Sequence, residues 1–444
     1  MITWRPAAIL VAGAFVVPLL PTPWAWALLL AGLVLAASAL DFALAGALRD
    51  LRLTREGTTQ LRLDDTAEVT VVVTNTGVRP VHAEIRDAWV PSAGAGPYQH
   101  HVDIEPDASV RLVTTLHPTR RGDRPAIRVT VRSYGPFGLA YRQPTGRGAD
   151  AMTPEWRLRV LPRFSSRRFL PEKLARLRII DGVIVTRGRG QGAEFDNLRE
   201  YVIGDDVRSI DWRATARRSD VIVRTWRPER DRRVLCVLDT GRTSAARVAT
   251  TIGDRTLDEP RLDAAIDAAL LLASLANHAG DRVDLLAIDT AVRAAVESGT
   301  SRTLLPRLVN AMAPLEPALV ETDFGLVAGE VLRRERKRAM VVLFTALEAG
   351  ALGEGLLPVL NQLTARHKVV VAAVHDPELV ELAGRRVDAP GVYAAAAAHR
   401  TLAERDRLRA ALHRHEVEVI DAPADVFASR VADAYLAMKA AGRL

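Results

Sequence analysis

Acids and arginines alternate at residues 188–217, the densest group of chemically capable side chains in this 444-residue chain. Carboxylates serve as general acids and bases and as Mg²⁺ ligands. The acids are Glu194, Asp196, Glu200, Asp205, Asp206 and Asp211, and the arginines are Arg199, Arg208, Arg213 and Arg217. An adjacent pair such as Asp205–Asp206 fits an acid/base couple, but Gly-Asp-Asp also fits a helix stop followed by an N-cap. Each acid has an arginine nearby, which predicts an ionic network for structure or docking, with catalysis as the alternative.

Apolar residues at helical spacing run through the same stretch, and a solvated charge run would not need them. They are Phe195, Leu198, Tyr201, Val202, Val207, Ile210 and Trp212. Their spacing predicts helical structure with a buried apolar seam. Gly188, Gly190 and Gly192 precede the stretch, but no strand and no Gly-Lys-Ser/Thr frames them, so they predict a loop that does not bind phosphate.

A second candidate site follows the apolar run at residues 234–238, where the sequence reads Asp239-Thr-Gly-Arg-Thr243. A carboxylate and a hydroxyl four positions apart in a tight turn can offer hard oxygen ligands to Mg²⁺. Thr322 could add a third oxygen, or it could instead cap a helix. The apolar run at 339–344 is followed by Thr345 and Ala346, so no second carboxylate stands there. Metal binding is therefore left open, with no other cofactor expected.

Composition narrows the possible functions. The formal net charge is +7, and there is one cysteine, Cys236, within an apolar run. A single cysteine excludes a disulfide framework and a multi-cysteine metal site. No lysine-rich arm or aromatic-basic stripe is present, so nucleic acid is not an expected partner.

Two apolar runs predict a pair of transmembrane helices within residues 1–48. They cover residues 7–20 and 24–40, with Pro21-Thr22-Pro23 between them. A bilayer core of about 30 Å needs about 20 helical residues, so the first run is short and the second is adequate if it continues past Asp41. Trp24 and Trp26 are expected at the far interface.

Basic residues flank this pair of runs on one side only. Arg5 precedes the first run, and Arg49, Arg52 and Arg55 follow the second. Positive charge stays on the cytoplasmic side, so both ends are predicted to be cytoplasmic. A cleaved signal peptide is the alternative, although it would leave the second apolar run unexplained.

The rest of the chain divides into three predicted segments. Residues 49–162 contain short β-branched runs between Pro and Gly clusters, which predicts a small β-sandwich. Residues 163–232 form a basic connector that contains the charged stretch. Residues 233–444 alternate apolar runs with helical periodicity, which predicts an α/β domain with a doubly wound parallel sheet. In such sheets ligands bind at the carboxyl ends of the strands, where Asp239, Thr345 and His375 stand.

The charged stretch resembles the signature of the domain of unknown function 58 family. The matching residues are Glu194-Phe195, Leu198-Arg199-Glu200-Tyr201, Gly204-Asp205-Asp206, Arg208-Ser209-Ile210-Asp211-Trp212 and Ala214-Thr215-Ala216-Arg217. The order of segments is similar too, with two membrane spans, a β-rich segment, the signature and a von Willebrand factor A-like domain. The resemblance implies a bacterial inner-membrane protein with cytoplasmic soluble domains and a MoxR-type AAA+ ATPase as partner.

The resemblance also bears on the second candidate site. The von Willebrand factor A-like domain of the family is similar to metal-dependent adhesion domains, whose first motif is Asp-x-Ser-x-Ser. Asp239 matches, Thr243 replaces the second Ser, and Thr322 matches the second-loop Thr. Gly241 replaces the first Ser, and Ala346 stands where an Asp is expected, so the adhesion site is degenerate.

The function expected from these features is that of an adaptor, not an enzyme, that acts with the ATPase in complex assembly or maturation. Two alternatives remain: a hydrolase-type enzyme that uses the acidic cluster, and an envelope scaffold without an ATPase partner.

Overall fold

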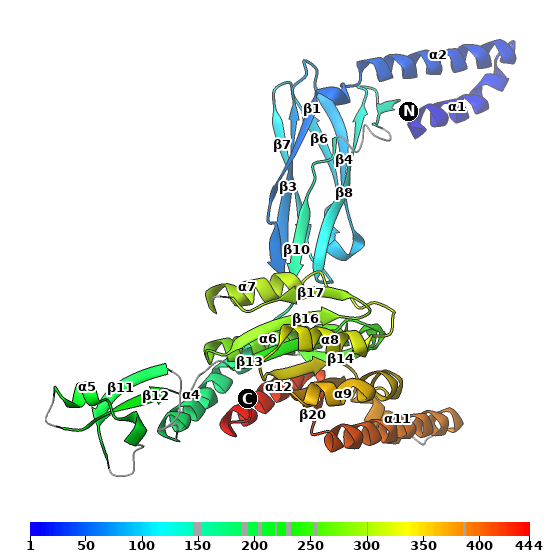
Figure 1. Ribbon diagram of the computed structural model, residues 1–444. Helices are drawn as coiled ribbons and strands as arrows, with labels where there is room; N and C mark the ends of the chain where they lie inside the picture. Colours follow the sequence, from blue (N-terminus) through cyan, green and yellow to red (C-terminus); the bar gives the residue numbers. More distant parts are fainter. Residues whose placement is uncertain are drawn as a thin grey trace. The chain divides into compact units, whose positions relative to one another are not determined.

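The computed structural model describes nine stretches of the chain. They are residues 1–144, 152–187, 194–202, 207–217, 220–227, 232–252, 255–299, 301–384 and 388–444. The chain forms two compact units, Met1–Leu161 and Pro162–Leu444. Strands dominate the first unit after its initial helices, and the second unit mixes strands and helices (Figure 1).

Two apolar helical segments begin the first unit. Helix α1 (Trp4–Val16) continues into the 3-10 turn η1 (Val17–Leu19), and α2 (Pro23–Leu44) follows after a break at Thr22, whose φ of 56° is left-handed. Within the described stretches, Pro23–Asp50 is the one segment long and apolar enough to cross a membrane, and a signal sequence near the N-terminus shares these properties.

Asp41 ends the uncharged part of α2 and is fully buried. Its Oδ1 accepts the Phe137 N–H at 2.8 Å, and its Oδ2 accepts the N–H groups of Leu139 at 2.7 Å and Ala140 at 2.8 Å. Gly135 approaches Asp41 so closely that a Cβ there would collide with it. The carboxylate thus fastens α2 to a turn of the β-rich domain, and the uncharged residues 23–40 span about 27 Å at ~1.5 Å per residue.

The β-rich domain consists of two sheets whose inward side chains share a core. One sheet has the order β1-β3-β7-β5, and the other has β2-β10-β8-β4-β6 with β9 paired to β8. Burial alternates along β3 and β4, and Val71, Ile85 and Val131 meet in one core cluster. The strands are β1 (Leu51–Gly57), β2 (Gln60–Arg62), β3 (Ala67–Asn75), β4 (Val81–Trp89), β5 (Ala95–Gly96), β6 (Gln99–Ile104), β7 (Ser109–Leu116), β8 (Gly122–Tyr134), β9 (Tyr141–Arg142) and β10 (Arg157–Leu161), with short 3-10 turns η2 (Leu48–Asp50) and η3 (Pro91–Ala93).

Arg55 belongs to this core and not to the membrane boundary. Its guanidinium is buried, pairs with Asp87 at 2.5 Å and lies over the Trp89 ring. The prediction that Arg55 supplies positive charge beside the membrane is therefore wrong, because β1 turns this side chain into the β-rich domain.

A six-stranded sheet forms the centre of the second unit, in the order β17-β16-β13-β18-β19-β20. Neighbouring strands from β16 to β20 are parallel, and β17 pairs antiparallel at the edge. The strands are β13 (Arg233–Asp239), β16 (Arg282–Ile288), β17 (Val292–Val296), β18 (Met340–Phe344), β19 (Lys368–His375) and β20 (Glu418–Pro423). Strands β13, β18 and β19 are almost continuously buried, as expected for strands covered on both faces.

Helices cover both faces of this sheet. On one face Val327, Leu360 and Leu412 join strand residues in a core cluster. On the other, Phe344 of β18 meets Phe427 edge to face, with ring centroids 6.2 Å apart. The helices are α6 (Arg261–His278), α7 (Ser301–Met312), α8 (Phe324–Arg334), the π-helix η7 (Ala349–Leu356), α9 (Leu357–Thr364), α10 (Glu378–Gly384), α11 (Ala389–Arg414) and α12 (Ala424–Ala440).

The segment that enters the second unit packs against α6 and α12. The 3-10 helix η4 (Ser165–Phe169) leads into α4 (Leu170–Arg187). The Ser166 N–H and hydroxyl both donate to Asp267 of α6, and Lys173 pairs with Asp433 of α12 at 2.8 Å. A hairpin of β14 (Arg247–Ile252) and β15 (Arg255–Pro260) precedes α6, and Arg163 pairs with its Glu259.

Candidate functional site

Asp239 lies at the carboxyl end of β13 and collects hydrogen bonds from three separate loops. It is only 2% exposed. Its Oδ2 accepts the hydroxyls of Thr243 at 2.9 Å and Thr345 at 2.6 Å. Its Oδ1 accepts the Gly241 N–H at 2.8 Å and the Thr322 hydroxyl. The predicted residues Asp239, Thr243 and Thr322 therefore meet at one point, and Thr345 joins them.

Thr322 does not cap α8, because the neighbouring Asp323 does so by accepting the Leu326 N–H. The alternative of a helix-capping Thr322 is therefore wrong. Its hydroxyl is directed at Asp239 instead. Position 241 requires glycine, since a Cβ there would collide with the Thr322 hydroxyl and lie 2.9 Å from the Val320 carbonyl oxygen.

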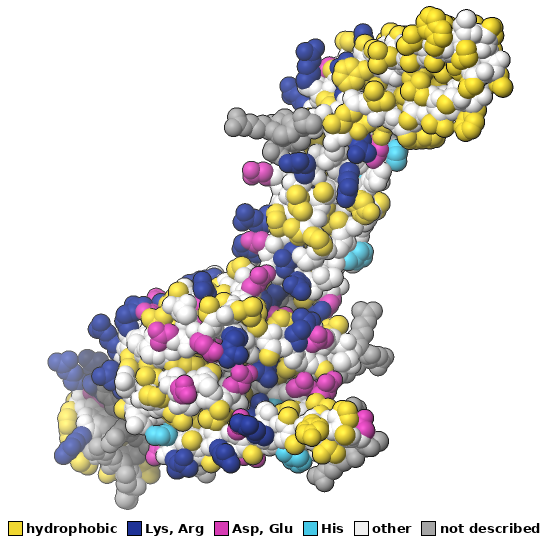
Figure 2. Space-filling model, turned by 90° about the vertical axis from the view of Figure 1, so that its right-hand side faces the viewer, with side chains coloured by type: hydrophobic (Ala, Val, Ile, Leu, Met, Phe, Trp, Pro, Cys, Tyr) yellow, Lys and Arg dark blue, Asp and Glu magenta, His cyan; other side chains and the backbone are white. Residues whose placement is uncertain are grey.

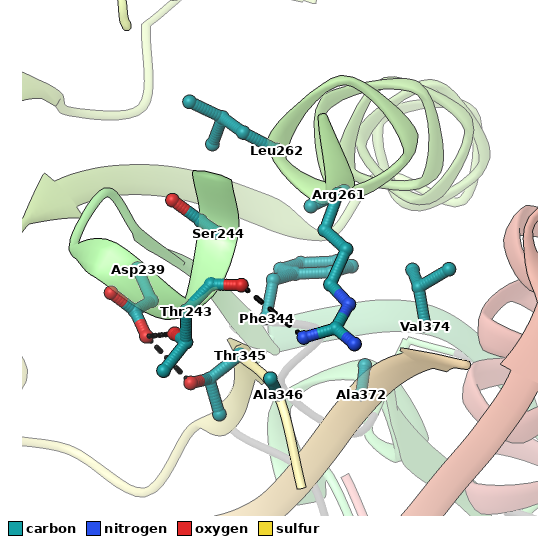
Figure 3. Close-up of a pocket in the computed structure, with 11 residues that line it drawn as sticks. Asp239, Thr243, Ser244, Arg261, Leu262, Phe344, Thr345, Ala346, Ala372 and Val374 are labelled. Atoms are coloured by element: carbon teal, nitrogen blue, oxygen red, sulfur yellow. Dashed lines mark hydrogen bonds between the residues drawn. The ribbon is translucent and has the colours of Figure 1, made fainter. Parts of the chain in front are cut away.

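A recess beside this cluster contains about 260 Å³ of empty space, part of it open to solvent. Figure 3 shows the Arg261 side chain extending from α6 across the recess toward Thr243 and Ala346. The Arg261 guanidinium pairs with Glu348 at 2.8 Å and approaches the Thr243 carbonyl oxygen at 3.4 Å. Arg261 and Glu348 were missed by sequence reasoning, because nothing in their local pattern links them to Asp239.

These groups do not fit a divalent cation. A Mg²⁺ or Ca²⁺ site gathers several oxygens with compensating negative charge. Here one carboxylate already accepts four donors, Ala346 supplies no second carboxylate, and a guanidinium shares the recess. Within the described residues, no group of three or more His, Cys, Asp or Glu side chains is arranged to hold a metal.

We expect calorimetric titration of the full chain with Mg²⁺ or Mn²⁺ to give only heat of dilution. The physical reason is the single carboxylate of Asp239, whose oxygens are occupied by hydroxyl and N–H donors. Asp239→Ala is the matched variant and should behave identically. Metal binding by the unmodified chain that Asp239→Ala abolishes would overturn this expectation.

Residues 194–200 of the charged stretch form a strand where helical structure was predicted. β11 (Glu194–Glu200) pairs antiparallel with β12 (Ile222–Arg227), and the described residues between them include two short helical turns, η5 (Val207–Ser209) and α5 (Trp212–Thr215). The helical prediction is wrong for 194–200 because the partner strand, more than twenty residues on, satisfies its backbone groups. Ile222 and Val223 of β12 are buried.

Asp211 has a structural role in this module. Its Oδ1 accepts the N–H groups of Arg213 and Ala214 at 3.0 Å each, which caps α5. Its Oδ2 accepts Arg224 Nε at 2.8 Å. The Ala214 N–H and then the Arg224 guanidinium lower the pKa of Asp211. The expected ion-pair partners were Arg199, Arg208, Arg213 and Arg217, so the pairing with Arg224 of β12 is a correction.

The other described signature residues lie along the same module. Gly204, Asp205 and Asp206 lie outside the described residues, so their predicted roles stay predictions. Glu194 stands opposite Arg227 in the strand register, and the Tyr201 N–H donates to the Val221 carbonyl oxygen at 2.7 Å. Arg199 donates to the Glu200 carbonyl oxygen at 3.1 Å, while Arg208 and Arg217 are exposed.

Four residues of the predicted buried seam are exposed instead, while Tyr201 and Ile210 are half-buried. Trp212 is 68% exposed, and Leu198, Val202 and Val207 are also among the exposed large apolar residues. A two-stranded sheet with one short helix has too little material to cover all of its apolar side chains. Large apolar side chains left in solvent are typical of interaction surfaces when they lie together. We call Leu198, Val202, Val207 and Trp212, grouped by their place in the signature stretch, the signature patch.

A buried carboxyl at the opposite end of the sheet, Glu335, has a strongly shifted pKa. Burial raises the pKa of Glu335 to about 7, a hydrogen bond with Asp284 raises it as well, and Arg233 at 3.1 Å opposes the shift. Since the folded chain binds this proton more tightly than the unfolded chain, Glu335 stabilises the fold fully below a pH of about 4.3. This contribution is lost as the pH rises through about 7.

We therefore expect the free energy of unfolding to fall with pH across this window and to fall less steeply in Glu335→Gln. Burial also raises the pKa of Asp267 to about 6, so part of the slope should remain. Thermal unfolding at a series of pH values measures the slope of the free energy of unfolding against pH. Glu354→Gln, at an exposed position, is the control. Equal slopes in Glu335→Gln and the unmodified chain would contradict the assignment.

Comparison with known families gives one match over half of the chain. A family model described as "Protein of unknown function DUF58" matches residues 197–418. Uncharacterized proteins of Mycobacterium tuberculosis and Mycobacterium bovis are each 30% identical over 196 residues, which is 44% of this chain. The chain spans 58% of the length of these relatives.

Two solved structures show a weak likeness. A CARDB domain from Pyrococcus furiosus is 15% identical with a TM-score of 0.19, covering 27% of this chain and 90% of that domain. Native alpha-2-macroglobulin from Escherichia coli is 14% identical with a TM-score of 0.21, covering 26% of this chain and 17% of that one. Neither likeness carries a conclusion about fold or function.

Proposed function

This chain belongs to the DUF58 family of proteins of unknown function, and on that premise we propose that it is a membrane-anchored adaptor. In this role it faces the cytosol and acts with a MoxR-type AAA+ ATPase in the assembly or maturation of protein complexes. The ATPase is proposed from the family resemblance of the signature.

The signature patch is the observation that carries this proposal. Trp212 and the other three apolar residues of the patch are exposed, and Arg208, Arg213 and Arg217 are close to them in the sequence. Tryptophan and arginine are the residues most enriched at the energetic centres of protein interfaces. A solvent-facing tryptophan in the family's own motif is better explained by a partner than by the fold, to which it contributes little buried area.

The Asp239 cluster supports binding in preference to catalysis. We propose that the second unit is von Willebrand factor A-like, with Asp239, Thr243 and Thr322 at the position of the adhesion motif. The departures at Gly241 and Ala346 favour recognition of a protein client without metal. The hydroxyls already satisfy Asp239, so no free base is poised there.

For the membrane, we propose that α1 and α2 cross together as a hairpin and that the soluble units are cytoplasmic. Gly13 of α1 lies close enough to Leu30 of α2 that a Cβ there would collide, which suits two helices in direct contact. Arg5 and Arg49 flank the pair on one side, in keeping with the positive-inside rule.

The test is co-purification of the detergent-solubilised full chain with a MoxR-type ATPase, with and without ATP. We expect association in the unmodified chain and a loss of about ten-fold or more in Trp212→Asp, the size expected for a central interface residue. Ile179→Asp on α4 is the matched control, because Ile179 is 68% exposed, as is Trp212. A clean failure of the unmodified chain to associate in either nucleotide state would sink the proposal.

The two alternatives differ from the proposal in what they require of the acidic cluster and of the ATPase. An enzyme that uses the acidic cluster needs carboxylates free to exchange protons, whereas Asp211 is held by two backbone N–H groups and Arg224. A scaffold without an ATPase would show no nucleotide-sensitive association at all, and Trp212→Asp would leave its other contacts unchanged.

A further inference from the structure

The end of α2 and a turn of the β-rich domain are joined by more than Asp41. Arg142 donates from Nε to the Phe42 carbonyl oxygen at 3.0 Å and lies over the Phe42 ring. Arg79 donates to the Ala43 carbonyl oxygen at 3.3 Å. Arg5, at the start of α1, donates to the Phe137 carbonyl oxygen at 3.1 Å. Turns 76–80 and 135–140 are therefore held against the ends of α1 and α2.

The depth of these turns relative to a bilayer follows from the length of α2. Trp24 is the second residue of α2 and Asp41 ends its uncharged part, a separation of about 26 Å at ~1.5 Å per residue. Trp4 is exposed and lies at the Asp41 end, because the Thr3 N–H donates to the Leu139 carbonyl oxygen. Tryptophan is enriched at both membrane interfaces, so Trp24 of α2 marks one interface and Trp4 of α1 marks the other. Turn 135–140 then falls in the headgroup layer.

The side chains around these turns are amphipathic. Phe137 is 59% exposed, and Val78 is among the most exposed apolar residues of the chain. None of Arg5, Arg79 and Arg142 forms an ion pair with a described residue, and each guanidinium has more N–H donors than its bonds to carbonyl oxygens use. We call Arg5, Val78, Arg79, Phe137 and Arg142 the tip surface. Figure 2 shows Lys and Arg side chains where the apolar helices meet the β-rich domain.

We propose that the tip surface is a lipid-binding site, in which Val78 and Phe137 enter the headgroup layer and the three arginines bind the phosphates of anionic phospholipids. Charge complementarity and continuity with α2 argue for lipid as the occupant, since planar guanidinium groups bind phosphate in two-point contacts. The inference rests on the proposed membrane anchoring of α2. It adds that the β-rich domain is itself fixed on the bilayer surface.

Spin-label depth measurement on the full chain in lipid nanodiscs tests this placement. Burial raises the pKa of the Cys236 thiol to about 12, so a thiol reagent reacts with an introduced cysteine and spares Cys236. Labels at Val78→Cys and Phe137→Cys are expected at headgroup depth by their collisions with oxygen and a water-soluble nickel complex. Ile127→Cys on β8 is the matched control, 58% exposed, and is expected to stay in water.

A spin label at Leu29→Cys on α2 distinguishes failure of the proposed membrane anchoring from failure of the tip-surface proposal. If Leu29 reads as aqueous, the membrane anchoring itself is wrong. If Leu29 is deep while Val78 and Phe137 are as aqueous as Ile127, anchoring stands and the tip-surface proposal is overturned.

The arginine contacts are tested with nanodiscs that contain equal amounts of phosphatidylglycerol and phosphatidylcholine. Native mass spectrometry of the released chain should show preferential retention of phosphatidylglycerol. Arg79→Gln should lower this preference about five-fold, the effect of one arginine near an anionic surface, and Arg157→Gln on β10 should leave it unchanged. Equal retention of both lipids by the unmodified chain would overturn the headgroup assignment.

Discussion

Asp41→Ala is expected to lower the free energy of unfolding of the first unit by about 3–5 kcal/mol, because it leaves the N–H groups of Phe137, Leu139 and Ala140 without an acceptor. Each buried donor left unsatisfied costs about 1–3 kcal/mol, and water that enters the loosened turn recovers part of the sum. The loss should appear as a lower unfolding temperature of the detergent-solubilised full chain and as faster proteolysis within residues 135–142.

Two further variants test whether the effect comes from the acceptor oxygens of Asp41. Asp41→Asn keeps the shape and one acceptor oxygen, so it should fall between Asp41→Ala and the unmodified chain. Asp50→Asn, on the turn that follows α2, changes a more exposed carboxylate and should have little effect. If Asp41→Ala melts and cleaves like the unmodified chain, the three hydrogen bonds do not hold the helix to the β-rich domain.

Lys439→Met should be comparably severe in the second unit, at about 3–5 kcal/mol. Lys439 Nζ lies 3.0 and 2.9 Å from the two carboxylate oxygens of Asp281, and the Tyr435 hydroxyl donates to the same carboxylate at 2.5 Å. All three side chains are buried. Removing the ammonium strands a buried negative charge, which costs far more than the lost lysine contacts alone. Chemical denaturation of the full chain measures the change.

A double-mutant cycle distinguishes this mechanism from a simple packing defect. In an Asp281→Asn background no charge is stranded, and the amide oxygen can still accept from Tyr435, so Lys439→Met should cost much less there. The exposed Lys337→Met serves as the control for loss of a lysine. Equal costs of Lys439→Met in both backgrounds would mean that the ion pair contributes nothing beyond volume.

Regular periodicity made much of the second unit predictable. The apolar runs at 234–238, 339–344 and 368–374 form β13, β18 and β19, and the alanine- and leucine-rich segment from 262 forms α6. These elements are long, strongly patterned and buried against neighbours, so local sequence and tertiary packing favour the same structure.

The signature stretch was harder to predict for a physical reason. Its apolar residues fit a helical spacing, yet β11 forms because β12 supplies the backbone partners from a distant part of the chain. The pairing of Asp211 with Arg224 depends on the same register. Local periodicity carries no information about which strand lies alongside, so the structure of residues 194–200 and the ion-pair partner of Asp211 were both predicted wrongly.

The sequence by itself determined the apolar N-terminal helices, the alternation of strands and helices after residue 233, and the residues that carry the family signature. All of these depend on residue type and short-range spacing. Only the tertiary structure decided what the polar groups do. Thr322 and Thr345 reach Asp239 from 83 and 106 positions away, and Asp41 meets a turn almost 100 residues on. Such contacts follow from strand order and packing, which bring together side chains that no local pattern connects.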